Sequence, residues 1–369
     1  MTEEFGGKPS RVKGGNPIAG PEIRPDSGLE PKALPPEVFD VIPTCAWFPP
    51  TLLPAFGALL MVASMDAAPV RVQTAATYRG WSDAVILSNG RVEAVLVPSV
   101  GRWMQFRRAG AKDGPFWENP SLAGKPMPAK PWEASHGSFG GDKTWPAPQS
   151  AWNWPPPDVF DAAPLSFRVP GDGSVVLTSP VSPRYGIRTE RRFSLQPSSD
   201  TVEVTTTYEK VQGPPVEAGV WVITQTQDPV AAFLPIPPGS RYPGDFSHQW
   251  GVPTNHVTVR QDWVELRRDK AASHKIGNDA GQIVWVGKEW VLLIETDRDA
   301  AAPHADEGCS TEIYTNPDPT PYVELETLGR LQTMRVGNRL SATNRYTLRP
   351  RQSKDPLEEA RHIAGRGSR

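Results

Sequence analysis

The sequence predicts an all-β fold of antiparallel sheets that pack face to face. Short runs rich in Val, Ile, Thr and aromatic residues alternate with turn residues along most of the chain. The 42 prolines and 32 glycines make up about a fifth of the 369 residues, which is typical of a chain with many turns. No long amphipathic pattern of helical period competes with the strand-like runs.

Residues 1–50 differ from the rest of the chain. They are polar and are interrupted repeatedly by proline and glycine, as in GGKPS, GGNP and EPKALPP. Such a composition buries too little apolar surface to offset the entropy of ordering the chain. We therefore expect a disordered N-terminal extension that is not part of the fold.

Residues 51–69 contain the apolar run LLPAFGALLMVA, followed by the small residues of SMDAAPV. This order is typical of the apolar core and cleavage site of an export signal, and the run is too short to span a bilayer. We expect cleavage near Ala67 and a periplasmic or secreted protein, with a translation start closer to the run than Met1. The alternative is a short interfacial or buried segment in a cytoplasmic protein, because the nearest basic residue upstream is Lys32.

Residues 70–350 carry the strand-like runs and are expected to form one β-sandwich domain. Asn89-Gly90 lies between the apolar runs DAVILS and RVEAVLVP, a strong signal for a β-hairpin. Further strands are predicted at SVVLTSP, GIRTERRFSL, TVEVTTTYE, AGVWVITQT, HVTVR, DWVELRR, GQIVWVG, EWVLLIE, TEIYT, PYVELE and NRYTLRP. Residues 351–369 are expected to form a short helix, capped by Asp355, and a basic tail.

A long segment between Pro115 and Pro157 is expected to be a loop on the sandwich, and long loops on rigid scaffolds often carry binding sites. Its tryptophans offer flat apolar faces, and its polar side chains offer hydrogen bonds, the two needs of a pyranose ring. The alternative is that the tryptophans only fix the loop to the sheet. The candidate ligand-binding residues are His136, Lys143, Trp145, Gln149 and Trp152.

The second candidate segment is YVELETLGRL. Glu324 and Glu326 point to the same face of an extended strand, because side chains alternate with a period of two. Two crowded carboxylates raise the pKa of one of them, which is useful in a cleft, although a solvated strand face is equally consistent with this pattern. Gln225 in VWVITQTQ and Lys275 in SHKIG are weaker candidates for the same site.

Several function classes are disfavoured by the composition. The 39 Lys and Arg residues against 41 Asp and Glu provide no basic surface for nucleic acid. Only Cys45 and Cys309 are present, and the six histidines have no metal-ligand spacing, so no cofactor is expected and only a metal site assembled from distant residues stays open. HGSFG lacks the first glycine of a nucleophile elbow, and GGDKTW lacks the spacing of a phosphate loop.

The order GGDKTWPAPQ, WVITQTQDP, SHKIG and PYVELETLGRL resembles the DUF4380 family of uncharacterised bacterial proteins over about residues 70–350. That family is placed in the galactose mutarotase-like superfamily, so the resemblance implies a β-supersandwich fold and a carbohydrate ligand. In the aldose 1-epimerases of this superfamily a glutamate acts as the base on the anomeric hydroxyl, and a histidine acts as the acid on the ring oxygen. Laying VELET over their motif puts Glu326 at the position of the base.

The sequence departs from those enzymes at the acid, because VWVITQTQ has Gln225 where they carry a histidine. Lys143, Lys275 or His136 would have to supply the proton in an epimerase-like enzyme. The alternative is a non-catalytic carbohydrate-binding or envelope interaction module. A lysine or histidine about 5–8 Å from Glu326, across an open cleft, would favour the enzyme.

Overall fold

The first of two antiparallel sheets begins at the N-terminal end of the domain. The computed structural model describes residues 69–128, 138–152, 154–161, 163–251 and 255–365. Within these residues the sheet has eleven strands, with β20 (Gln332–Met334) paired to β10 outside the main order. That order is β1 (Arg71–Tyr78), β2 (Trp81–Ser88), β3 (Val92–Val97), β4 (Arg102–Arg108), β5 (Asp142–Ala147), β10 (Val216–Gln227), β19 (Tyr322–Leu328), β18 (Thr311–Thr315), β15 (His274–Asn278) and β12 (Ser247–Trp250).

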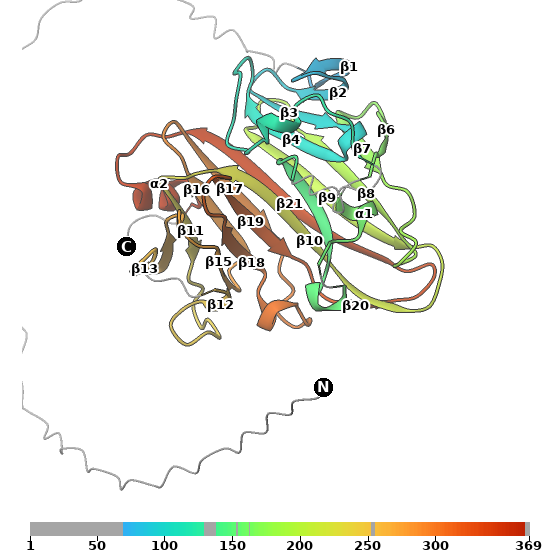
Figure 1. Cartoon of the computed structure of the whole chain (residues 1–369). Coiled ribbons are helices and arrows are strands. Elements are labelled where there is room, and N and C mark those ends of the chain that lie inside the picture. The colour runs from blue at the N-terminus through green and yellow to red at the C-terminus, as the bar shows by residue number, and fades with distance from the viewer. Residues whose placement is uncertain (1–68, 129–137, 153, 162, 252–254, 366–369) are drawn as a thin grey trace, which may run out of the picture. The chain divides into compact units, whose positions relative to one another are not determined.

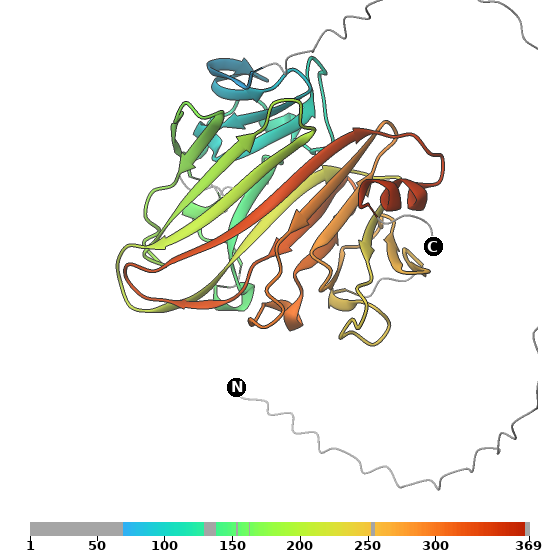
Figure 2. The ribbon, with the colours of Figure 1, turned by 180° about the vertical axis from the view of Figure 1, so that it is seen from behind.

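The second sheet packs against the first, and Figures 1 and 2 show the two sides of the sandwich. Ten strands belong to it in the described part of the chain. Their order is β13 (Val257–Arg260), β14 (Trp263–Leu266), β11 (Ala231–Pro235), β16 (Gln282–Val286), β17 (Trp290–Thr296), β21 (Arg339–Pro350), β9 (Thr201–Lys210), β8 (Ile187–Leu195), β7 (Ser174–Thr178) and β6 (Ser166–Arg168). The predicted all-β fold of antiparallel sheets is therefore confirmed.

Helices contribute little to the described residues. The helix α2 (Pro356–Ile363) begins after Asp355, whose carboxylate accepts from the backbone N–H of Leu357, and it packs on the outer face of β11, β16 and β17. The other helical segments are α1 (Asp158–Asp161) and single turns at Pro98–Val100, Pro120–Leu122, Gln149–Ala151 and Asp306–Gly308. No helix in the described ranges is long and apolar enough to cross a membrane.

The main core lies between the sheets. The ring of Trp103 on β4 lies 5.5 Å from that of Phe193 on β8 and 4.7 Å from that of Tyr346 on β21. Beside these rings, the buried Asp142 forms an ion pair of 2.5 Å with Arg191 of the second sheet and accepts a hydrogen bond of 2.8 Å from Tyr346. A polar contact between the sheets is thus embedded in an apolar core.

The expected hairpin around Asn89-Gly90 is present. β2 and β3 pair in antiparallel register, and Gly90 has a φ of 81°. The Asn89 side chain accepts from the backbone N–H groups of Arg91 and Val92, which fixes the turn. Asn89 therefore both signals the hairpin in the sequence and stabilises it.

The expectation that the segment between Pro115 and Pro157 contains no strand is wrong. β5 lies within it and pairs with β10 over six residues, although its sequence DKTWPA has few residues of high β-propensity. β4 pairs with β5 only at Asp142, so among the described residues no strand pairs with that side of β5 near Pro146. Proline is tolerated at such a position because it has no N–H to donate.

Several predictions concern residues outside the described ranges. These are the disordered extension 1–50, nearly all of the segment 51–69, Trp132, the candidate ligand residue His136 and the end of the C-terminal tail.

Candidate functional site

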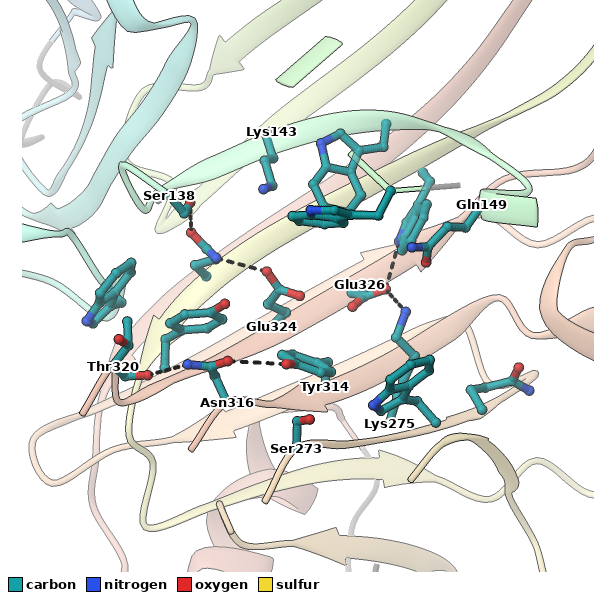
Figure 3. Close-up of a pocket in the computed structure, with 18 of the residues that line it drawn as sticks. Ser138, Lys143, Gln149, Ser273, Lys275, Tyr314, Asn316, Thr320, Glu324 and Glu326 are labelled. Carbon is teal, nitrogen blue, oxygen red and sulfur yellow. Dashed lines mark hydrogen bonds and ion pairs between the residues drawn. The ribbon is translucent and has the colours of Figure 1, made fainter. Parts of the chain in front are cut away.

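A pocket of about 700 Å³ lies on the face of the first sheet that points away from the second sheet. Its floor is formed by six neighbouring strands, β5, β10, β19, β18, β15 and β12. Figure 3 shows side chains that line it. The lining residues are Trp117, Asn119, Ser138, Lys143, Trp145, Gln149, Trp154, Trp221, Gln225, Gln249, Trp250, Ser273, Lys275, Asp306, Tyr314, Asn316, Thr320, Tyr322, Glu324 and Glu326.

Strand register brings the polar residues of the floor together. Gln225 on β10 lies opposite Glu324 on β19, and Glu324 lies opposite Tyr314 on β18. Tyr314 in turn lies opposite Lys275 on β15. Because directly paired residues point to the same face, these four side chains form one row across the sheet.

The neighbouring row on the same face of the sheet contains two carboxylates that lie opposite each other. Glu326 lies opposite Glu312 on β18, and Glu312 lies opposite Gly277 on β15. A Cβ at Gly277 would lie 2.8 Å from Cγ of Glu312 and 2.7 Å from Sγ of Cys309. Glycine is therefore needed here so that Glu312 can occupy its position beneath the pocket.

Lys275 supplies the positive charge that Glu326 and Glu312 share. Its Nζ lies 2.8 Å from Oε2 of Glu326 and 3.1 Å from Oε2 of Glu312, and both carboxylates are fully buried. The ammonium also lies 4.6 Å from the centre of the Trp221 ring, whose Nε1 donates to the same Glu326 oxygen at 2.8 Å. Burial alone lowers the pKa of Lys275, but the two carboxylates outweigh it and raise this pKa above its ordinary value. Lys275 is thus a permanent cation.

The buried carboxyls around Lys275 are crowded. Burial, opposed by Lys275 but assisted by the negative charges of Glu326 and Asp306, raises the pKa of Glu312 well above its ordinary range. The positive charge next to these acids is that of Lys275. In the described part of the chain, no group of three or more His, Cys, Asp or Glu side chains is arranged to hold a metal ion.

Glu324 is the more accessible of the two predicted carboxylates. It is 9% exposed, whereas Glu326 borders the pocket but exposes none of its surface. Oε1 of Glu324 accepts a hydrogen bond of 2.9 Å from Gln225. The amide oxygen of Gln225 in turn accepts a hydrogen bond of 2.6 Å from Ser138 (Figure 3). Burial and the neighbouring Glu326 raise the pKa of Glu324 to about 7, against the opposing effects of Lys143 and Lys275. Glu324 therefore exchanges protons near neutral pH.

Lys143 approaches the pocket from β5 and is also paired. Its Nζ lies 3.0 Å from Oδ1 of Asp161 and 4.1 Å from the centre of the Trp145 ring. Asp161 also accepts from Nε1 of Trp145 at 2.8 Å and forms an ion pair with Arg102. Burial raises the pKa of Asp161, but Lys143 and Arg102 outweigh it and lower this pKa overall. Asp161 thus holds both Lys143 and Trp145 in place.

Aromatic rings form the walls of the pocket. Trp145 is buried, with its ring edge-on to that of Trp221 at 5.3 Å and to that of Trp154 at 6.3 Å. Trp154 and Trp250 are 62% and 64% exposed at the rim. At another part of the wall the rings of Trp117 and Tyr322 lie 4.9 Å apart. Flat apolar faces therefore surround a polar floor.

Most of the predicted site residues lie together. Glu324, Glu326, Gln225, Lys275, Lys143, Trp145 and Gln149 all border the pocket. Trp152 does not border it, because its buried ring packs edge-on against Trp145 and its Nε1 donates to the carbonyl of Pro146. Trp152 supports the wall from behind, as the alternative interpretation of the loop tryptophans expected. His136 lies outside the described residues.

Lys275 does not meet the criterion that would favour an enzyme, a lysine or histidine across an open cleft from Glu326. Lys275 contacts Glu326 directly instead of facing it across 5–8 Å of open space. None of the histidines within the described ranges borders the pocket. The side chain with a pKa near neutrality is instead Glu324, next to Glu326 on the same strand.

Sequence reasoning missed the pocket residues Trp221, Trp250, Tyr314 and Tyr322, and Glu312 beneath the pocket. Glu312 and Tyr314 belong to the predicted strand TEIYT, where their spacing of two repeats that of Glu324 and Glu326. That repeated spacing was a usable signal, but only the register between β18 and β19 shows that the pairs coincide. Trp250 lies on the short edge strand SHQW, which carries little strand pattern.

No family model and no curated protein matches the chain, so the resemblance to the DUF4380 family stays a prediction. Solved structures do match. A galactose mutarotase-like protein from Lactobacillus casei has a TM-score of 0.49 and 8% identity, over 72% of this chain and 100% of that one. A galactose mutarotase related enzyme from Lactobacillus acidophilus has a TM-score of 0.47 and 9% identity, over 72% and 97%. A galactose 1-epimerase from the same species has a TM-score of 0.43 and 8% identity, over 76% and 99%.

Proposed function

We propose that this protein binds carbohydrate in the pocket and that Glu324 and Glu326 transfer protons at the anomeric centre of the sugar, as in an aldose 1-epimerase-like isomerase. One observation carries the proposal. A single pocket combines tryptophan faces with two neighbouring carboxyl groups, one paired to a lysine and one with a pKa of about 7.

The shape and chemistry of the pocket suit a pyranose. Its volume of about 700 Å³ lies in the usual range of small-molecule sites. The indoles of Trp145 and Trp154 suit the C–H face of a sugar ring. Ser138, Asn119 and Glu324 on the floor and wall offer hydrogen bonds to its hydroxyls.

The two glutamates are suited to opposite steps of proton transfer. Glu326, paired with Lys275, takes the proton of the anomeric hydroxyl, while protonated Glu324 gives its proton to the ring oxygen. The C1–O5 bond then breaks to give the open-chain aldehyde, and closure on the other face of the carbonyl returns both protons. The number of protons on the protein is unchanged over one cycle.

In this proposal neither lysine is the general acid, although the sequence made both Lys143 and Lys275 candidates for that role. Lys275 is the counter-ion of Glu326, because its raised pKa makes it a poor proton donor. Lys143 is held by Asp161 and offers a fixed positive charge at the β5 side of the pocket. Gln225 orients Glu324 through its amide N–H.

The second candidate function is sugar binding without turnover. It is favoured by the burial of Glu326, whose Oε2 is already bonded to Trp221 and Lys275 and whose Oε1 is covered and has no partner among the described residues. A hydroxyl can reach this oxygen only if neighbouring side chains move. In this alternative the two acids only accept hydrogen bonds from the ligand.

Binding and turnover are separated by two measurements on the full-length chain. Calorimetric titration with common hexoses and pentoses tests binding, and NMR exchange between the α and β anomers of each bound sugar tests turnover. We expect Glu324→Gln and Glu326→Gln each to lower the exchange rate at least 100-fold, the usual scale of one acid or base. Glu203→Gln, on the second sheet, is the control. Binding without exchange in the wild type supports the second candidate, and no binding refutes both.

We also propose that the protein acts outside the cytoplasm. The proposal rests on the export-signal pattern of residues 51–69. Mass spectrometry of the protein from its native cells tests it. A mature chain that begins near Ala68 supports export, and an intact chain that begins at Met1 contradicts it.

A further inference from the structure

Trp250 is unusual in its exposure. Its indole is 64% exposed and that of Trp154 is 62% exposed, and they are the two most exposed large apolar side chains in the described part of the chain. Both border the same pocket. Exposing an indole sacrifices the gain in free energy from burying it, so two such residues at one pocket indicate surfaces kept open for a ligand.

A β-bulge turns Trp250 toward the pocket. In the pairing of β12 with β15, His248 lies opposite Ile276 and Trp250 lies opposite Lys275, with Gln249 as the extra residue. Ile276 points into the core between the sheets, whereas Lys275 points into the pocket. In a regular strand Trp250 would share the face of His248. The bulge reverses this and re-aims the indole, a common use of bulges beside binding sites.

The backbone positions of Trp250 and Glu324 are too far apart for one sugar ring to lie over both. Glu324, Tyr314, Lys275 and Trp250 are successive partners on β19, β18, β15 and β12, so three strand spacings, about 14 Å, separate Glu324 from Trp250 along the sheet. A pyranose ring is only about as wide as one strand spacing, roughly 5 Å. The space between them therefore accommodates more than one ring.

Polar groups accompany the indole, as a sugar subsite requires. Gln249, which precedes Trp250 in the chain, borders the pocket together with Ser273 and Asp306. The Gln249 amide is fixed by its hydrogen bonds to Ser247 Oγ at 2.8 Å and to the carbonyl of Asp306 at 3.1 Å. An apolar face with oriented polar neighbours is the arrangement that binds a sugar ring.

We propose that Trp250 forms a second sugar subsite at the β12 edge, so that the ligand is an oligosaccharide or the end of a glycan chain and not a free monosaccharide. This inference rests on the proposed carbohydrate function. One sugar unit contacts Glu324 on the floor, and a unit further along the chain stacks on Trp250.

The test measures affinity against chain length by calorimetric titration of the full-length protein. The probes are glucose, galactose, mannose, xylose and N-acetylglucosamine, and their α- and β-1,4-linked oligomers of two to four units. In at least one series we expect affinity to rise about tenfold or more from the monosaccharide to the trisaccharide. Trp250→Ala should remove this gain and leave the affinity for the monosaccharide within twofold, and Trp250→Tyr should keep most of the gain.

Phe167→Ala is the matched control, because Phe167 is an exposed aromatic residue on β6 of the second sheet, outside the pocket. It should leave every affinity unchanged. Two results overturn the second subsite alone: no gain with length, or an equal loss of monosaccharide and oligosaccharide affinity in Trp250→Ala. If no sugar of any length binds the wild type, the proposed function itself fails. Circular dichroism of each variant verifies folding.

Discussion

The ammonium of Lys275 lies 2.8 Å from Oε2 of Glu326, although β18 lies between the strands that carry them. The side chain reaches across this strand and contacts Glu312 on the way. One cation thus serves two fully buried carboxylates beneath the proposed sugar site. The pocket floor depends on this contact for its stability as well as for its charge.

Lys275→Met is expected to destabilise the fold by about 3–5 kcal/mol, because it leaves buried acids without their counter-charge. The loss should grow as pH rises, because the raised pKa of Glu312 delays its ionisation and the resulting buried charge has no counter-charge in the variant. Chemical denaturation at several pH values measures it. Lys270→Met, at an exposed position, is the control and should leave the melting temperature unchanged. An equal effect of the two variants would contradict the counter-ion role.

Glu324 makes stability depend on pH in a direction that its raised pKa fixes. The folded protein holds the proton up to about pH 7, whereas the unfolded chain loses it near 4.5. Protonated Glu324 therefore adds about 3 kcal/mol to the free energy of unfolding. This contribution is complete below pH 4.5 and is lost as the pH rises through 7.

Glu324→Gln keeps the hydrogen-bonding shape and removes this titration. We expect the variant to be more stable than the wild type above pH 8 and to show a flatter profile between pH 5 and 8 in denaturant titrations. Glu203→Gln serves as the control and should follow the wild-type profile. A Glu324→Gln profile parallel to that of the wild type would show that Glu324 does not titrate in this range.

Trp145 and Trp154 are expected to separate stability from binding. Trp145 is buried and bonded to Asp161, so Trp145→Ala should cost about 3–5 kcal/mol of folding free energy. Trp154 is 62% exposed, so Trp154→Ala should cost less than about 1 kcal/mol and should weaken sugar binding instead. Thermal unfolding and calorimetric titration of both variants distinguish the two roles. Trp145→Ala is therefore a poor probe of sugar stacking.

Two adjacent arginines on β8 allow a buried ion pair between the sheets to be compared with an exposed ion pair. Arg191 pairs with the buried Asp142, whereas Arg192 pairs with the exposed Asp172. Asp142→Ala should destabilise the protein by about 3–5 kcal/mol, because it leaves a buried guanidinium unpaired. Asp172→Ala should leave the unfolding midpoint in urea unchanged. Equal midpoints for the two variants would refute a structural role for the buried pair.

The sequence predicted the fold class well because strand signals are local. Asn89-Gly90 marked a hairpin, and the spacing of Glu324 and Glu326 placed both on one face, as the structure has them. Burial, and then the charge of the neighbouring Glu326, raise the pKa of Glu324. These predictions needed only the neighbouring residues.

The rest of the site depends on register between strands far apart in the sequence. No local pattern shows that Glu312 lies opposite Glu326, or that Lys275 reaches both. β5 was missed because Pro146 and few residues of high β-propensity hide the strand pattern, and Trp250 because a bulge, invisible in the sequence, decides which face it joins. Partners for the candidate residues were therefore harder to predict than the residues themselves.

Side chains along β5 point alternately to the pocket and to the second sheet. Lys143 and Trp145 point to the pocket, whereas Asp142 and Thr144 point to the second sheet and bond to Tyr346 and Tyr208. During evolution, changes at every second position can alter which ligand is selected while the intervening positions keep the two sheets joined. Insertion or deletion of one residue would exchange the two sets, so selectivity can diverge by substitution far more readily than by a change in strand length.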